Sequence, residues 1–191
     1  MRLLAGLVVW VVVGLSIQGC EASVNSSDSR DGGETSGGCA AVAYDLTRPP
    51  SREDLGMQPG KSFMDVSCDE GFEVSLTLPD GAQVSVTARR VNADSHSAAS
   101  PESGAPTTVD VHSVALNADE AVRLASGLAD DLGIDAQPLQ SWRAEVEGDG
   151  SAGNVDSPFM RNQLGYLTAE MQVQHLAASG NNYLHLIFTW D

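Results

Sequence analysis

Four oxygen-bearing side chains in one short segment are the first candidates for chemistry in this chain. They lie in the glycine-rich stretch 148–158, at Asp149, Ser151, Asn154 and Asp156. Calcium takes oxygen ligands at comparable spacings in its binding loops. However, the stretch lacks a run of carboxylates and a distal glutamate that could bind calcium through both oxygens. The pattern therefore favours a solvated acidic loop, with a calcium site as the weaker alternative.

The imidazoles are the next candidates for metal binding. The chain has His96, His112, His175 and His185. His175 continues the apolar alternation that begins at Leu167, so we expect it to face inward. His185 points away from its apolar neighbours, so we expect it on the opposite face of the sheet. Side chains on opposite faces cannot complete one coordination sphere, and the sequence therefore predicts structural histidines.

No string that marks a familiar catalytic site occurs in the sequence. It contains no G-x-S-x-G, S-x-x-K, H-E-x-x-H or P-loop pattern. The letters of Gly148–Gly153 match G-x-G-x-x-G, but a dinucleotide site needs that pattern between a strand and a helix, and here it follows a predicted helix. No cofactor is therefore expected. Adjacent acids such as Asp69-Glu70 and Asp130-Asp131 could serve a hydrolase only at a defined separation, which a sequence does not show.

The charge balance excludes two classes of partner. Among 191 residues, 26 are Asp or Glu and 10 are Lys or Arg, which gives a formal net charge of −16. Recognition of nucleic-acid phosphates needs a basic face, and electrostatic adhesion to anionic lipid also needs basic residues. We therefore expect no nucleic-acid partner and no attachment to a membrane through charge. The length corresponds to one domain of ordinary size.

The first twenty residues have the organisation of a targeting segment. Arg2 precedes an uncharged apolar run, Leu3–Leu15, which is short for a membrane-spanning helix and within the range of a signal-peptide core. The run is followed by Ile17–Cys20 (IQGC), which resembles the lipobox of bacterial lipoproteins. The resemblance implies that a signal peptidase cleaves after Gly19 and that the Cys20 thiol carries a diacylglyceryl group.

On this interpretation the chain has three parts. Residues 1–19 are a lipoprotein signal peptide, residues 20–38 a Ser- and Gly-rich acidic tether, and residues 39–191 a single globular domain. The tether is too polar to bury much surface, so we expect it to be flexible and to hold the domain about 20–25 Å from the anchor. The lipid places the protein on the extracytoplasmic face of the cell membrane. An uncleaved anchor helix and secretion without lipid stay open as alternatives.

An odd number of cysteines in an exported chain requires an explanation, because disulfides use them in pairs. If lipid occupies Cys20, then Cys39 and Cys68 remain, and an oxidising compartment favours a disulfide between them. A metal site is the alternative, but two thiolates are an incomplete ligand set and no histidine lies nearby in the sequence. A tether followed by this cysteine pair also resembles small exported lipoproteins of unknown function from high-GC Gram-positive bacteria, a resemblance that implies no site residues.

Alternation of apolar and polar residues predicts strands in both halves of the domain. Phe72–Leu78 and Ala82–Ala88 alternate on either side of Pro79–Gly81, which predicts a hairpin with a three-residue loop. In this register Leu76 lies opposite Val84, and the apolar residues of both strands share one face. Further strands are expected over 40–46, 63–68, 107–116, 167–174 and 183–190, of which the last two form a second hairpin.

Two helices are expected between the strand groups. Asn117 and Glu120 form a capping box at the start of the first helix, and Gly133 ends it in a left-handed cap. Asp135 is expected to cap a second helix with Pro138 in its first turn. Trp142 and Trp190 occupy apolar faces, so we expect them in the core. The elements predict an α+β fold, an antiparallel β-sheet with two hairpins packed by an αα-hairpin.

The anchor, the tether and the missing catalytic strings together predict a function. We expect a membrane-anchored, non-enzymatic binding or interaction module whose partner is an envelope protein or a small ligand. The alternatives are a cell-wall-directed hydrolase that uses acidic residues and a calcium-dependent binding domain.

Overall fold

The computed structural model describes residues 39–58, 61–94, 107–148 and 153–190. The predicted signal peptide, Cys20 and the tether lie outside these residues. The described chain contains eight strands and two helices: β1 (Val42–Asp45), β2 (Phe63–Thr77), β3 (Gln83–Asp94), β4 (Thr108–Ser113), α1 (Ala118–Leu132), α2 (Pro138–Gly148), β5 (Val155–Asp156), β6 (Met160–Leu164), β7 (Leu167–Leu176) and β8 (Asn181–Trp190).

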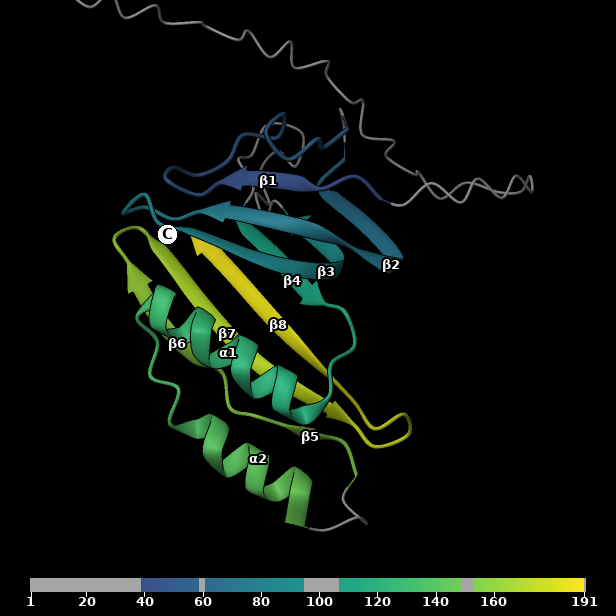
Figure 1. The fold of residues 1–191 in the computed structure, drawn as a ribbon. Helices are drawn as coiled ribbons and strands as arrows, with labels where there is room; N and C mark the ends of the chain where they lie inside the picture. The colour runs from purple at the N-terminus through teal and green to yellow at the C-terminus, as the bar shows by residue number, and fades with distance from the viewer. Residues whose placement is uncertain (1–38, 59–60, 95–106, 149–152, 191) are drawn as a thin grey trace, which may run out of the picture.

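The strands form one mixed sheet that is mostly antiparallel. Its order is β1-β2-β3-β4-β8-β7-β5, and β6 also pairs with β7. Figure 1 shows α1 lying along the β7–β8 part of the sheet, with α2 farther from it. The sequence predicted an antiparallel sheet, but β1 pairs with β2 in parallel. Residues 46–62 connect the two strands, and a connection of this length is long enough for a parallel crossover.

The hairpin of β2 and β3 confirms the predicted register. Val74 lies opposite Val86 and Leu76 opposite Val84. The two strands predicted over 63–68 and 72–78 are one strand, β2, whose register shifts between Ser67 and Phe72. Gly71 in this bulge has φ 83°, and a Cβ there would lie 2.5 Å from Cγ1 of Val114. The bulge therefore needs glycine and lets one strand continue through a sequence that resembles a turn.

The C-terminal hairpin of β7 and β8 was also predicted, but its neighbours were not. β5 and β6 both pair with the outer edge of β7. Residues 148–158 were predicted as loop. In β6 the partly buried position between the exposed Arg161 and Gln163 is the polar Asn162, which conceals the alternation. The Nδ2 of Asn162 donates a hydrogen bond to the carbonyl of Leu132 at 3.0 Å. This bond ties the edge of the sheet to the end of α1.

Both caps of α1 are those expected from the sequence. The amide of Glu120 donates to Oδ1 of Asn117 at 2.9 Å, and the amide of Asn117 donates to Oε2 of Glu120 at 3.0 Å. Gly133 ends the helix with φ 62°, and the amide of Ile134 donates to the carbonyl of Ala129. The side chain of Asp135 accepts a hydrogen bond from the amide of Gln137 at 3.0 Å. Gln137 directly precedes Pro138, the first residue of α2.

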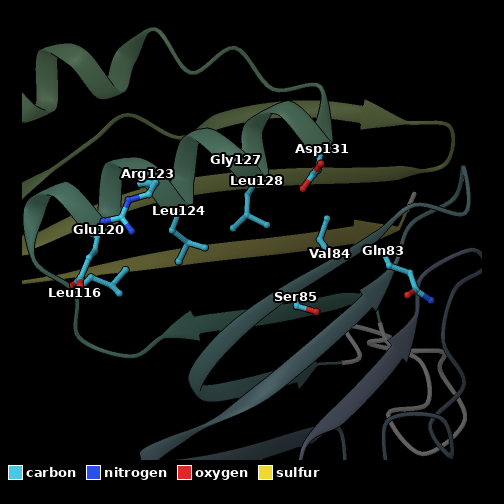
Figure 2. Close-up of a pocket in the computed structure, with 10 residues that line it drawn as sticks. All are labelled: Gln83, Val84, Ser85, Leu116, Glu120, Arg123, Leu124, Gly127, Leu128 and Asp131. Atoms are coloured by element: carbon cyan, nitrogen blue, oxygen red, sulfur yellow. The ribbon is translucent and has the colours of Figure 1, made fainter.

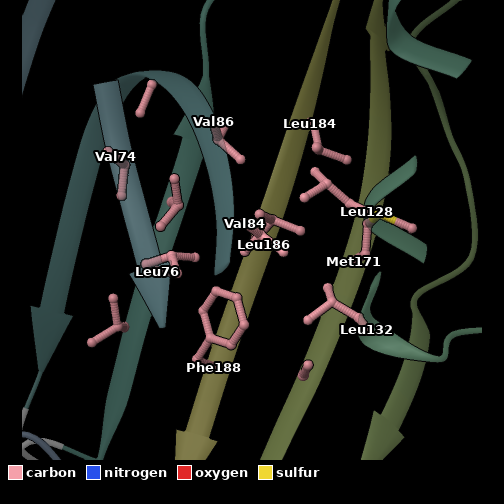
Figure 3. Close-up of a cluster of buried hydrophobic side chains, with 14 of the residues drawn as sticks. Val74, Leu76, Val84, Val86, Leu128, Leu132, Met171, Leu184, Leu186 and Phe188 are labelled. Atoms are coloured by element: carbon pink, nitrogen blue, oxygen red, sulfur yellow. The ribbon is translucent and has the colours of Figure 1, made fainter. Parts of the chain in front are cut away.

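The core lies between the helices and one face of the sheet. Figure 3 shows apolar side chains of the β2–β3 hairpin, of β7 and β8, and of α1 gathered in one cluster. Trp142 and Trp190 are both buried, as predicted. The indole N–H of Trp142 donates to the carbonyl of Val155 at 3.1 Å, which fixes α2 against β5.

The predicted disulfide is present between Cys39 and Cys68, whose Cα atoms are 6.1 Å apart. It joins the segment before β1 to the bulged part of β2. The bond closes a loop across a sequence separation of 29 residues, which restricts the unfolded chain.

Replacing both cysteines, Cys39→Ser with Cys68→Ser, is expected to lower the free energy of unfolding by about 2–4 kcal/mol. Urea denaturation of the oxidised wild type and the double variant measures the difference. Equal denaturation midpoints would show that the bond contributes nothing to stability.

Candidate functional site

The four weak candidates for calcium ligands lie only partly within the described structure. Asp149 and Ser151 lie outside the described residues. Oδ1 of Asn154 accepts a hydrogen bond from the amide of Ala177 at 3.1 Å, so it serves the β7–β8 turn. Asp156 lines a shallow hollow of about 510 Å³ beside α2. Within the described part of the chain, no group of three or more His, Cys, Asp or Glu side chains is placed to hold a metal ion.

The acidic pairs considered for hydrolysis are surface residues. Asp69, Glu70, Asp130 and Asp131 are all exposed. Two other exposed carboxyls have displaced pKa values. Hydrogen bonds from Thr47 lower the pKa of Asp45, and hydrogen bonds from Ser51 lower the pKa of Asp54. A general acid at neutral pH needs a raised pKa, so neither carboxyl is suited to that role.

His175 and His185 lie on opposite faces of the sheet, as predicted. Nδ1 of His175 is 2.8 Å from Oδ1 of the buried Asn182, a contact that agrees with the structural role expected for it. His96 lies outside the described residues. His185 faces away from the helices and pairs across the sheet with His112 of β4. The sequence did not predict the contact between His112 and His185, because this contact requires β4 to lie next to β8.

The two imidazoles of His112 and His185 are stacked. Their ring centroids are 4.2 Å apart with an interplanar angle of 14°. Oδ1 of Asp110 lies 3.2 Å from Nε2 of His185, and the ring of Phe159 meets His185 edge-on at 6.3 Å. A metal ion must lie near the plane of each ligating ring, so two parallel stacked rings cannot bind the same ion in this arrangement. The pair is a packing contact on the face of the sheet that carries neither helix.

A groove lies between α1 and the start of β3, with a volume of about 540 Å³. Figure 2 shows Leu124 and Leu128 of α1 extending into this space toward Val84 of β3. Leu116, in the connection from β4 to α1, completes the apolar lining. Glu120, Arg123 and Asp131 lie along the helix side of the groove.

The helix that walls the groove packs against the sheet along its buried face. The residues of α1 that face the sheet are buried: Ala121, Ala125, Leu128, Ala129 and Leu132. The small alanines let the helix approach β7 and β8 closely. The caps at Asn117 and Gly133 fix both ends, so the groove has a preformed wall.

A glycine lies in the middle of this wall. Gly127 lines the groove, and a Cβ built on it meets no atom within 4 Å. Neither a positive φ nor a close neighbour therefore requires glycine at this position. A larger side chain there would extend into the groove instead.

Sequence reasoning missed the groove because the helical spacing assigns Leu124 to the same apolar stripe as the core residues. In the structure Leu124 is only partly buried. Glycine at position 127, between two leucines of a strong helix, is the one signal that the sequence contains for this site.

Comparisons of the chain with protein-family models, with curated proteins and with solved structures gave no match. Neither helix of the described part of the chain is long and apolar enough to cross a membrane.

The stacked imidazoles predict a stability that depends on pH. Burial, and next the charge of His185, lower the pKa of His112 from 6.5 to about 4. The folded state therefore favours neutral His112, and the unfolded chain binds its proton more readily. The corresponding stabilisation is complete above pH 6.5 and is lost as the pH falls from about 6.5 to 4.

We expect the loss to be about 1–2 kcal/mol, because partial exposure reduces the full effect of the shift. Urea unfolding at a series of pH values measures it. His112→Gln is expected to flatten the slope between pH 6.5 and 4, and an unchanged slope in this variant contradicts the assignment.

Proposed function

We propose that the protein is a lipid-anchored, extracytoplasmic binding module that takes its ligand in the groove between α1 and β3. The lipobox-like sequence that ends at Cys20 supports the anchor. The groove supports the binding role, because it combines an apolar floor with charged residues at its border on rigid elements.

The observation that carries the binding role is glycine at position 127. Glycine inside a helix costs about 0.8–1 kcal/mol relative to alanine. At Gly127 this cost brings no gain in packing, since nothing lies within 4 Å of a Cβ at that position. The absence of a side chain at position 127 leaves the groove open, and this is the effect that we infer offsets the cost to the helix.

The finer architecture belongs to the same proposal. We infer that α1 and α2 act as an αα-hairpin that packs the two strand hairpins, with α1 forming the groove wall and α2 supporting the far end of the sheet. The bond from the Trp142 indole to the Val155 carbonyl and the bond from Asn162 to Leu132 support this arrangement.

A larger side chain at position 127, which would fill the groove, tests the binding role. The apolar anionic dye 1-anilinonaphthalene-8-sulfonate is expected to bind the folded protein saturably, with its rings on the leucines and its sulfonate near Arg123. Gly127→Leu is expected to weaken this binding by roughly tenfold or more, because the new side chain replaces the dye's apolar contacts.

Two matched variants control this experiment. Gly148→Leu changes an equally open glycine at the end of α2, outside the groove, and is expected to leave dye binding unchanged. Gly127→Ala adds only a methyl group and is expected to retain binding while raising the free energy of unfolding by about 0.5–1 kcal/mol. Equal dye affinity in Gly127→Leu and the wild type would falsify the proposed site.

The anchor has its own test. Cells that express the full chain and are fed an alkyne fatty acid are expected to label the protein at Cys20, and Cys20→Ser is expected to abolish the label. The double variant Cys39→Ser with Cys68→Ser should keep it. Wild-type protein without label contradicts the lipoprotein assignment.

A further inference from the structure

The wall of the groove formed by β3 is a free strand edge. The pairing of β3 with β4 begins at Ala88 and proceeds toward Asp94, so Gln83–Ser85 have no partner in β4. β4 ends at Ser113 and the chain turns away through Leu116, which pairs with Asn182 at the start of β8. β3 and β8 therefore separate beyond the end of β4, and the groove lies where they separate.

The direction of the free backbone groups follows from the alternation of the strand. The amide of Leu78 donates to the carbonyl of Ala82, so the even-numbered residues at the start of β3 bond to β2. The carbonyl of Thr87 accepts from the amide of Val114, so the odd-numbered residues turn to the other side. Gln83 and Ser85 thus direct their N–H and C=O groups toward the groove that they line.

The surface above this edge is suited to an extended segment. A strand added beside β3 would lie about 4.7–4.9 Å from it, with alternate side chains on each face of the sheet. On the helix side these side chains would meet Leu124, Leu128 and the open space at Gly127. On the other side they would lie beside the side chain of Ser85, near the surface. An alternating apolar and polar peptide satisfies both faces.

The charges around the groove indicate the character of that peptide. Glu120 and Asp131 border the helix side and Asp130 is exposed next to them, whereas Arg123 is the one base among the described residues that line the groove. Gln83 and Ser85 add no charge. The chain as a whole carries a net charge of −16, so a second copy is repelled and a basic partner is attracted over a long range.

We propose that the groove binds a basic, extended segment of a partner protein by strand addition to Gln83–Ser85. The inference rests on the groove of the proposed function and names the chemistry of its ligand. Main-chain hydrogen bonds hold the segment, its apolar side chains pack under α1, and its lysine or arginine side chains lie near Glu120 and Asp131.

The probe for the test is a blocked five-residue peptide of alternating lysine and valine, titrated into the full mature chain. Binding is expected to slow the amide exchange of Gln83 and Ser85 at least tenfold, measured by NMR. The amides of Val84 and Val86 already bond to β2 and are expected to change little. Binding that leaves the exchange of Gln83 and Ser85 unchanged contradicts strand addition.

Backbone methylation of the peptide separates strand addition from attraction by charge. Two analogues are compared, each N-methylated on one of the two alternating sets of residues. Because alternate amides of a strand point in opposite directions, one analogue is expected to lose binding and the other to retain it. Equal affinities of the two analogues overturn the proposal. A peptide with glutamate in place of lysine is expected not to bind, and its binding would overturn the basic character of the ligand.

Variants of the protein complete the test. Gln83→Pro removes one free N–H at the first residue of a strand, where proline is tolerated, and is expected to weaken peptide binding roughly threefold to tenfold. The pair Glu120→Gln with Asp131→Asn, which retains the capping box, is expected to weaken binding more than the pair Asp69→Asn with Glu70→Gln. Equal effects of the two pairs contradict recognition at the groove.

The two proposals fail in different ways. If Gly127→Leu still blocks the dye and the peptide produces none of these effects, the groove stands as a binding site and strand addition is wrong. If the dye is insensitive to Gly127→Leu, the groove itself is wrong as the binding site.

Discussion

The pairing of β4 with β8 joins the early and late parts of the chain into one sheet, and the rest of the structure depends on it. Val109 lies opposite Phe188 and Val111 opposite Leu186, so the contact is apolar on the helix side. On the other side His112 stacks on His185. The hydroxyl of Ser113, which is buried on the same face as Val111, accepts a hydrogen bond from the amide of Leu184 at 2.8 Å. These pairs bring together residues 71–79 positions apart, and their burial offsets the entropy of closing that loop.

The end of this pairing also creates the groove. After Val114, whose amide still bonds to β3, the chain leaves β3 and follows β8. There Leu116 and Asn182 exchange backbone hydrogen bonds of 2.9 Å, and Nδ2 of Asn182 adds a third to the Leu116 carbonyl. α1 then begins at once and packs on β7 and β8. The start of β3 has no strand on that side, and the same turn of the chain that directs α1 onto the core leaves Gln83–Ser85 unpaired.

A free strand edge is ordinarily a liability, because it can pair with any other extended chain. Here the edge is short, charged side chains of α1 lie above it, and the high negative charge of the protein opposes association of like copies. These features limit pairing to a small, basic segment. Glycine at position 127 fits the same account, since it leaves space above the edge at a cost to the helix.

The sequence by itself determined the elements that depend on neighbours along the chain. Alternation predicted the register of Leu76 with Val84, the capping box predicted the start of α1 at Asn117, and the count of cysteines predicted the Cys39–Cys68 disulfide. The first two follow from local geometry, and the disulfide follows because only two cysteines remain once Cys20 is assigned to the lipid. The parallel pairing of β1, the edge strand β6 and the stack of His112 on His185 needed the tertiary structure, because the order of strands in a sheet is set by the burial of distant apolar faces. The groove also depends on the tertiary structure, because β3 and β8 must diverge to leave the space that Leu124 and Gly127 line.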